Sequence, residues 1–169
     1  AERIRFENGK FYQAEMTSCG LNNGSLKGHG KYPSYIACNL YGRNGTMFYS
    51  MIKHRKGGYP YITQDGRDRE EGPDQYVANM CDGAVAGYKY FDLADTKEIR
   101  ANIMGNADGT ITVKDGDGPD AAVLCAIKVS GAGSGKGFVG KFDNVKNNQA
   151  LFFSFKGKGT FKFISFDLK

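Results

Sequence analysis

The chain has 169 residues, enough for one domain with a sizeable hydrophobic core or for a domain with an appendage. Its 24 glycines, 12 phenylalanines and 10 tyrosines, with no tryptophan, favour short strands joined by tight turns. No apolar run reaches the length of a membrane span, and no nucleic-acid-binding signature accompanies the net charge of +5. We therefore expect neither a membrane nor a nucleic acid as a partner.

The first third of the chain has the pattern of short strands. Strands are expected at residues 11–17, 32–42 and 46–55. The polar, glycine-rich sequence KHRKGG that ends this region is typical of a break between units. We therefore expect an N-terminal extension over residues 1–57 and a second domain over residues 58–169.

The central stretch YVANMCDGAVAGYKYFDL, residues 76–93, is organised about a turn pair. An apolar run leads to Asp82 and Gly83, and the residues that follow alternate with a period of two. Such alternation beside a glycine-containing turn predicts strand, turn, strand rather than helix. The preceding sequence ITQDGRDREEGPDQ, residues 62–75, is charged and turn-rich and is expected to be a surface loop.

The remaining residues continue the β pattern. Two strands are predicted about a turn at residues 106–109, and a further strand, with a short helix as the alternative, at residues 121–130. The last twenty residues are predicted to form a hairpin that reverses at residues 157–159. Its apolar side chains share a core face: Leu151, Phe153, Phe155, Phe161 and Phe163. About ten strands without an amphipathic helix indicate an all-β fold, a jelly-roll or related β-sandwich.

No set of side chains predicts catalysis. Five carboxylates lie in the 62–75 loop, where glycine and proline neighbours favour solvated groups over an acid and base held across a glycosidic bond: Asp65, Asp68, Glu70, Glu71 and Asp74. The four cysteines lack a CxxC spacing, so neither a zinc site nor a redox motif is indicated, and both disulfides and free thiols stay open. We expect the chain itself not to be an enzyme.

Two sequence patterns resemble a known family. The pattern D-G-x-x-x-x-Y-K-x-x-D at residues 82–92 and the sequence FKGKGTFKFISF at residues 155–166 are similar to those of family 6 carbohydrate-binding modules. Residues 11–40 resemble the end of the catalytic propeller of certain family 43 glycoside hydrolases. YITQDGRDREEGPDQY, residues 61–76, and the DGAVAGYKYF that follows resemble the accessory module after that propeller.

The resemblance implies a non-catalytic module with a jelly-roll β-sandwich fold of the galactose-binding-like kind. Its expected ligand is a plant cell-wall polysaccharide or oligosaccharide such as xylan or arabinoxylan. Its expected partner is an attached glycoside hydrolase catalytic domain, and its expected location is secreted or at the cell surface. The alternative is a structural accessory domain that packs on a glycosidase without binding glycan itself.

The resemblance also implies site residues. Family 6 modules hold a sugar ring against a tyrosine and a tryptophan and hydrogen-bond it through an asparagine. Position by position, the tyrosine falls near Asn79, the tryptophan near Phe138 and the asparagine near Thr160, and none of the three is identical. With Tyr76 and Lys158, these are the expected carbohydrate-binding residues.

The family often carries a structural calcium ion near the sandwich termini. The resemblance places its ligands at Gln64 and Asp65 on the first strand of the module and at Asp167 on the last. The sequence YQAE, residues 12–15, offers an alternative register for that first strand. Oxygen donors of this kind are the ligands that calcium prefers.

Overall fold

The computed structural model describes residues 2–22, 24–46, 58–66, 75–131 and 135–169. These residues form strands and one short 3₁₀ helix, η1 (Ser34–Ile36), so the expected all-β class is confirmed. None of the described helical structure is long and apolar enough to cross a membrane. The strands, in chain order, are β1 (Arg5–Glu7), β2 (Lys10–Tyr12), β3 (Leu26–Lys27), β4 (Gly30–Pro33), β5 (Asn39–Tyr41), β6 (Tyr61–Gln64), β7 (Gln75–Met80), β8 (Val85–Asp92), β9 (Glu98–Lys114), β10 (Val123–Val129), β11 (Lys136–Lys141) and β12 (Gln149–Leu168).

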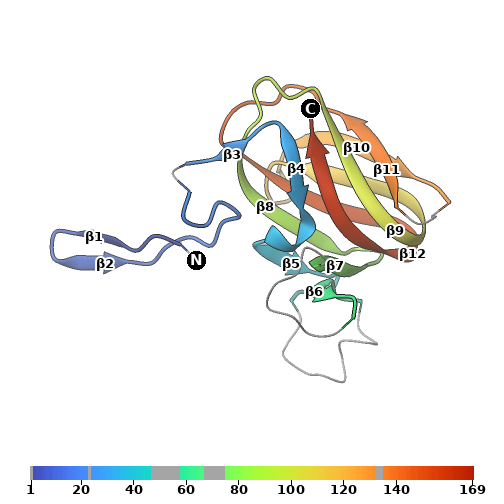
Figure 1. The fold of residues 1–169 in the computed structure, drawn as a ribbon, viewed down its shortest axis with the longest axis horizontal. Helices are drawn as coiled ribbons and strands as arrows, with labels where there is room; N and C mark the ends of the chain where they lie inside the picture. Colours follow the sequence, from blue (N-terminus) through green and yellow to red (C-terminus); the bar gives the residue numbers. More distant parts are fainter. Residues whose placement is uncertain (1, 23, 47–57, 67–74, 132–134) are drawn as a thin grey trace.

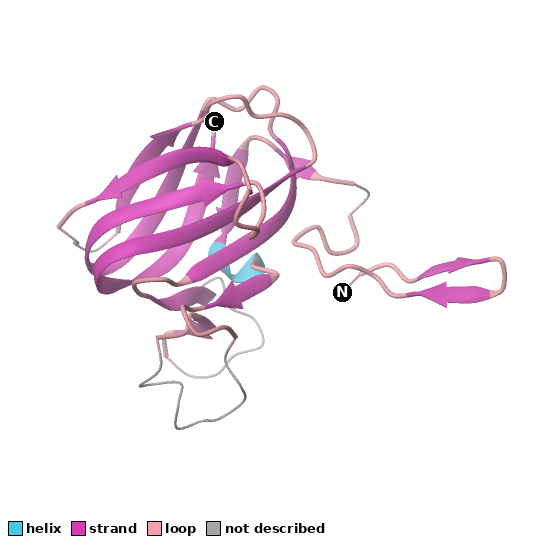
Figure 2. Ribbon diagram, turned by 180° about the vertical axis from the view of Figure 1, so that it is seen from behind, coloured by secondary structure: helices cyan, strands magenta, loops and turns pink. Residues whose placement is uncertain are grey.

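The two longest strands, β9 and β12, pair antiparallel along almost their whole length and enter both layers of the sandwich (Figure 1). The first half of β12 also pairs with β8, and its second half pairs with β7 and β4. In β9, the first half pairs with β11 and the second half with β10. The sheet therefore curls into two layers about the β9–β12 pair, as Figure 2 shows from behind.

Glycines bend the two long strands where they pass between the layers. Gly109 and Gly157 face each other across the pair, and a Cβ atom on either would overlap backbone of the opposite strand. Gly105 and Gly159 adopt positive φ angles of 134° and 79°, which L side chains rarely adopt. The turns predicted at residues 106–109 and 157–159 are therefore wrong: both glycine-rich segments bend a continuous strand and do not reverse it.

The predicted strand, turn, strand of residues 76–93 is confirmed as β7 and β8, but both strands pair with β12. The turn between them crosses β12 at its bend. Gly83 N donates to Phe155 O at 2.8 Å, and Gly157 N donates to the Asp82 carboxylate at 3.1 Å. The Asp-Gly pair thus carries the chain from one layer to the other.

An aromatic cluster fills the space between the layers. Phe153 and Phe163 have ring centroids 5.0 Å apart, and Tyr88 meets Phe166 edge-on at 4.9 Å. The expected core face of the last segment is confirmed, because all five of its apolar side chains are buried: Leu151, Phe153, Phe155, Phe161 and Phe163. The Tyr88 hydroxyl donates to Ser34 O at 3.0 Å, and burial raises the pKa of this phenol well above its usual range.

Residues 26–41 belong to the sandwich. β3 and β5 pair with β8, and β4 pairs with β12. The expected extension over residues 1–57 therefore needs correction for this part, because strand pairing with distant segments does not follow local composition. What projects from the sandwich is residues 2–22, here called the arm, which carries β1 and β2 (Figure 1). The strand predicted at residues 46–55 lies almost entirely outside the described residues.

The four cysteines are free thiols in this structure. Cys19 and Cys125 are buried, and burial raises the pKa of the Cys125 thiol to about 12. A thiol with so high a pKa carries almost no thiolate at neutral pH and is a poor nucleophile. Cys125 therefore acts as a small apolar residue in the core.

Candidate functional site

A groove of about 700 Å³ lies across neighbouring strands of the sheet, where the β6–β7 pair adjoins the β9–β12 pair. Its lining mixes aromatic rings, hydroxyl groups, amides and one ammonium group. The residues are Tyr61, Thr63, Tyr76, Ala78, Asn79, Met104, Gly105, Asn106, Gly159, Thr160, Phe161 and Lys162. A concave surface with apolar walls and a few polar groups is typical of a small-ligand site.

The registers of the two strand pairs explain why these side chains meet. On one wall, Tyr61 is paired with Ala78 and Thr63 with Tyr76. On the other wall, Asn106 is paired with Thr160 and Met104 with Lys162. Because side chains alternate along a strand, residues two apart point to the same face. Each wall therefore presents two cross-strand pairs to the groove.

Asn79 joins the two walls. Its φ of 59° places it in the left-handed region, which asparagine tolerates better than most residues. Its Nδ2 donates to Tyr59 O at 2.9 Å, and its Oδ1 accepts from Thr160 Oγ1 at 3.4 Å. The amide thus holds β7 against β12 at the end of the groove.

A charged cluster lies at the other end of the groove. The Tyr76 hydroxyl donates to Asp65 Oδ1 at 2.7 Å, and Lys162 Nζ donates to both Asp65 oxygens, at 2.9 and 2.8 Å. Lys162 Nζ also lies 4.6 Å from the centre of the Tyr76 ring. The hydrogen bonds from Lys162 and Tyr76 lower the pKa of Asp65, and the hydrogen bond to Asp65 raises the pKa of Lys162.

The Asp65 pair predicts a titration that can be measured. In an NMR pH titration, the Asp65 carboxyl is expected to titrate below an ordinary aspartate, and Lys162→Met should move its midpoint upward. Because the folded-state pKa is lowered, the pair stabilises the fold above the unfolded pKa of about 3.9, and this contribution is lost as pH falls through the folded value. Lys158→Met, on the same strand, is the control and should leave the midpoint in place. An Asp65 midpoint that is the same in all three proteins would refute the pair.

Three of the five predicted carbohydrate-binding residues line the groove: Tyr76, Asn79 and Thr160. Phe138 does not, because its ring packs against the hydrophobic core from β11, opposite the buried Ala101. Lys158 is exposed on β12 outside the lining. The resemblance thus predicts three residues of the groove, but the position that matches the family's stacking tryptophan, Phe138, lies outside it.

Among the nine lining residues that sequence reasoning missed are Tyr61, Thr63, Met104, Asn106 and Lys162. Tyr61 and Thr63 carried a usable signal, since they lie two apart on a short strand. The other three of these five were hidden by the wrong turns at residues 106–109 and 157–159. Only the continuous β9–β12 register brings Met104 and Asn106 opposite Lys162 and Thr160.

The expected calcium ligands come from two strands: Gln64 is the last residue of β6 and Asp65 follows it, while Asp167 lies near the end of β12. Asp65 is bound by the ammonium group of Lys162, and Asp167 accepts from Asn102 Nδ2 at 2.8 Å near the far end of β12. Within the described ranges, no three His, Cys, Asp or Glu residues are grouped so that they could hold a metal ion. Calcium binding therefore stays a prediction of the resemblance, without a ligand set here. Four acidic residues of the 62–75 loop lie outside the described residues: Asp68, Glu70, Glu71 and Asp74.

The chain is similar in sequence or structure to parts of larger enzymes. No protein-family model matches the sequence. The chain is 36% identical over 169 residues to a xylosidase/arabinosidase from Thermoclostridium stercorarium, and the match covers 99% of this chain and 35% of that protein. The chain thus spans about a third of the length of this curated relative.

Solved structures share the fold at low sequence identity. The module CsCBM6-3 from Clostridium stercorarium, in complex with cellobiose, matches at a TM-score of 0.64 and 17% identity, over 88% of this chain and 98% of its own. A family 6 module from Clostridium cellulolyticum, in complex with xylose, matches at a TM-score of 0.64 and 14% identity. The match covers 85% of this chain and 99% of that module. A family 43 arabinoxylan arabinofuranohydrolase from Bacillus subtilis matches at a TM-score of 0.63 and 14% identity. The match covers 99% of this chain and 33% of that enzyme. The resemblance seen in the sequence is confirmed: the chain has the β-sandwich fold of family 6 carbohydrate-binding modules and aligns along its length with part of a xylosidase/arabinosidase.

Proposed function

We propose that this chain is a carbohydrate-binding module that holds a plant cell-wall polysaccharide of the xylan or arabinoxylan class for a glycoside hydrolase. The observation that carries the proposal is the groove where β6–β7 adjoins β9–β12. It is open, partly aromatic and lined by neutral hydrogen-bonding groups together with one lysine, Lys162. The fold of sugar-binding modules supports the same role.

The groove has the chemistry that a neutral sugar chain requires. A pyranose ring presents an apolar C–H face, which packs against aromatic and thioether side chains such as Tyr61 and Met104. Its hydroxyl groups require donors and acceptors, which Asn106, Thr63 and Thr160 provide. Such polar groups fix the orientation of a ligand that apolar contact alone would leave free to slide.

The same lining supports binding rather than cleavage. Glycoside hydrolysis requires two carboxyl groups held about 5–10 Å apart across the scissile bond. The described lining residues include no aspartate or glutamate. Asp65, at the edge, is bound by Lys162 and Tyr76, which keep it ionised and unsuited to donate a proton.

The names of the similar proteins support a particular class of ligand and a particular kind of partner. The curated relative is named a xylosidase/arabinosidase, and the solved modules hold xylose and cellobiose. Their names support a xylan-like ligand here and a glycoside hydrolase as the attached partner. A polysaccharide of the plant cell wall lies outside cells, so we propose that this protein is secreted or lies at the cell surface.

A structural accessory domain that packs on a glycosidase without binding glycan is the second candidate. One observation favours it: the position that matches the stacking tryptophan of the family is Phe138, whose ring contributes to the core. In that case the groove results from the curvature of the sheet and has no role in binding. Glycan binding distinguishes the two functions.

Affinity electrophoresis of the whole chain tests the proposal. Gels that contain xylan, arabinoxylan, mixed-linkage glucan or no polysaccharide are compared, with an inert protein of similar mass as the reference. We expect retardation by xylan or arabinoxylan, without release of reducing sugar. A folded chain whose mobility no polysaccharide changes would contradict the binding function and favour the structural one.

A further inference from the structure

We propose that the arm, residues 2–22, is a docking element that adds to a glycoside hydrolase catalytic domain of the kind found in the xylosidase/arabinosidase relative. The inference rests on the proposed association with a glycoside hydrolase, but it does not depend on glycan binding in the groove. Its basis is an exposed apolar hairpin, a firmly held root and the extent of the alignments.

The arm exposes several large apolar side chains. Phe6 and Phe11 are 58% and 76% exposed, and their ring centroids lie 4.7 Å apart. Ile4, Met16 and Leu21 are also more than half exposed. A lone two-stranded hairpin is marginally stable in water, and a contiguous apolar patch marks an interaction site. The arm therefore requires a partner that covers it.

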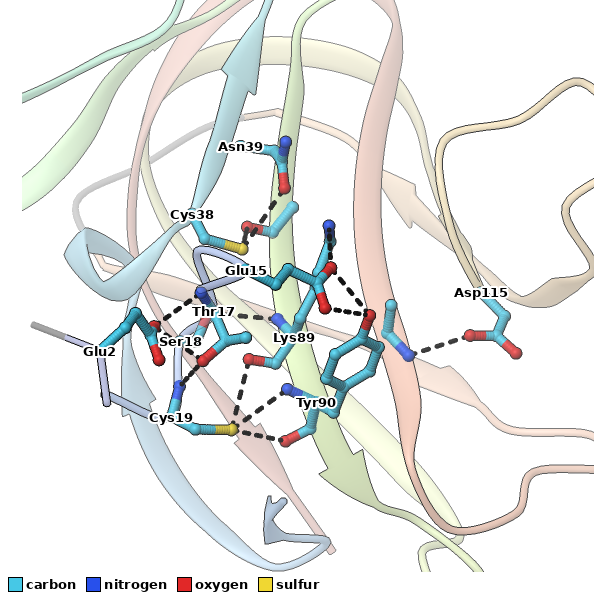
Figure 3. A network of polar contacts seen from close by, with 12 residues as sticks. Glu2, Glu15, Thr17, Ser18, Cys19, Cys38, Asn39, Lys89, Tyr90 and Asp115 are labelled. Carbon is cyan, nitrogen blue, oxygen red and sulfur yellow. Dashed lines mark hydrogen bonds and ion pairs between the residues drawn. The ribbon is translucent and has the colours of Figure 1, made fainter. Parts of the chain in front are cut away.

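The root of the arm, residues 15–19, is hydrogen-bonded to β8 of the sandwich (Figure 3). Ser18 N donates to Lys89 O at 2.6 Å, and Lys89 N donates to Ser18 Oγ at 3.2 Å. Glu15 accepts from Lys89 Nζ and from the Tyr90 hydroxyl, both at 3.0 Å. Glu2 accepts from Thr17 N and Thr17 Oγ1 at 2.7 and 2.9 Å, which closes the two ends of the arm on each other. The arm is thus presented in a set direction, which lowers the entropy cost of docking.

The arm also presents open strand edges. β1 and β2 pair only with each other among the described strands, so each has an outer edge of backbone N–H and C=O groups. Such edges pair readily with another chain, and strand addition with pockets for alternate side chains is a common form of recognition. The partner that fits is a sheet with an available edge and an apolar hollow for Phe6 and Phe11.

The alignments indicate which partner this is. Isolated modules match 85–88% of this chain while covering almost all of their own length. The arabinoxylan arabinofuranohydrolase, an enzyme with further chain beyond the module, matches 99%. The additional matched portion is about the size of the arm, and the curated relative also aligns over 99%. A match over 99% of this chain includes the arm, so the arm has a counterpart in both enzymes, and the matched part is only about a third of each. This favours another domain of such an enzyme, rather than a second copy of this chain, as the partner.

Hydrogen exchange measured by mass spectrometry tests the inference. Two proteins are compared: this chain alone, and the Thermoclostridium stercorarium enzyme with its aligned third replaced by this chain. We expect backbone amides of residues 4–12 to exchange at least about 100-fold more slowly in the chimera than in the isolated chain. Phe6→Ser/Phe11→Ser should abolish that difference, whereas Val123→Ser, an exposed apolar residue on β10, should not.

The remaining outcomes decide the inference. Equal exchange of residues 4–12 in the isolated chain and in an active chimera would overturn it. So would a concentration-dependent dimer of the isolated chain that Phe6→Ser/Phe11→Ser abolishes, because a second copy would then cover the arm. If the chimera is inactive, the natural enzyme replaces it, and its segment aligned with residues 4–12 should be protected. Arm protection without polysaccharide retention would contradict the proposed function alone, and retention without protection would contradict this inference alone.

Discussion

Phe153→Ala is expected to lower the free energy of unfolding by about 3–5 kcal/mol, the usual cost of deleting a fully buried aromatic ring. Phe153 has no exposed surface, and its ring lies 5.0–5.5 Å from those of Tyr88, Phe163 and Phe166. Removing it opens a cavity at the centre of the sandwich, where the two long strands bring both layers together. The change should leave the groove residues in place.

Urea denaturation followed by circular dichroism measures this effect. Val123→Ala on β10 is the control, because Val123 is 58% exposed and its truncation should cost less than about 0.5 kcal/mol. If Phe153→Ala costs no more than Val123→Ala, the aromatic cluster is not the core of this fold. The layer arrangement derived from β9 and β12 would then be wrong.

Gly159→Ala is expected to destabilise the protein by about 2–6 kcal/mol. The residue adopts a φ of 79°, and a Cβ atom there would overlap the carbonyl oxygen of Asn106 on β9. Strain in the left-handed region and backbone crowding each cost about 1–3 kcal/mol. Because Asn106 and Gly159 both line the groove, the strands must separate at the site itself.

Gly118→Ala is the matched control for this change. Gly118 has no atom within 4 Å of the position of a new Cβ, so its replacement should leave stability within about 0.5 kcal/mol. Thermal unfolding of the two variants beside the parent protein gives the comparison. A Gly159→Ala variant as stable as Gly118→Ala would contradict the tight β9–β12 bend.

The sequence predicts the fold class and the core well, because burial leaves a local trace. Alternation with a period of two places Leu151, Phe153 and Phe155 on one face, and all three are buried. The same local signals mislead at glycines. Gly157 and Gly159 indicate that the backbone can adopt unusual angles there, but not which structure it forms. A strand that bends between two layers and a hairpin turn have the same glycine-rich sequence pattern.

The groove is less predictable for the same reason. Asn79 and Thr160 follow from family resemblance, and the structure joins them by a hydrogen bond. Lys162 and Met104 enter only through the register between β9 and β12, which are distant in sequence. Phe138 shows the limit of position-by-position transfer, because a matched position can have its side chain in the core.

Isothermal titration of the whole chain and two variants of β6 tests the central claim, that the groove binds glycan. The titrant is an oligosaccharide of the polysaccharide that retards the chain most. Tyr61→Ala removes a ring from the groove and is expected to weaken binding by about 1–3 kcal/mol, with base stacking on aromatic side chains as the guide. Ile62→Ala alters the next residue, which is 44% exposed and outside the groove lining, and should leave the affinity unchanged. Equal affinities for the parent and Tyr61→Ala, with both proteins folded, would contradict the assignment of this groove as the glycan site.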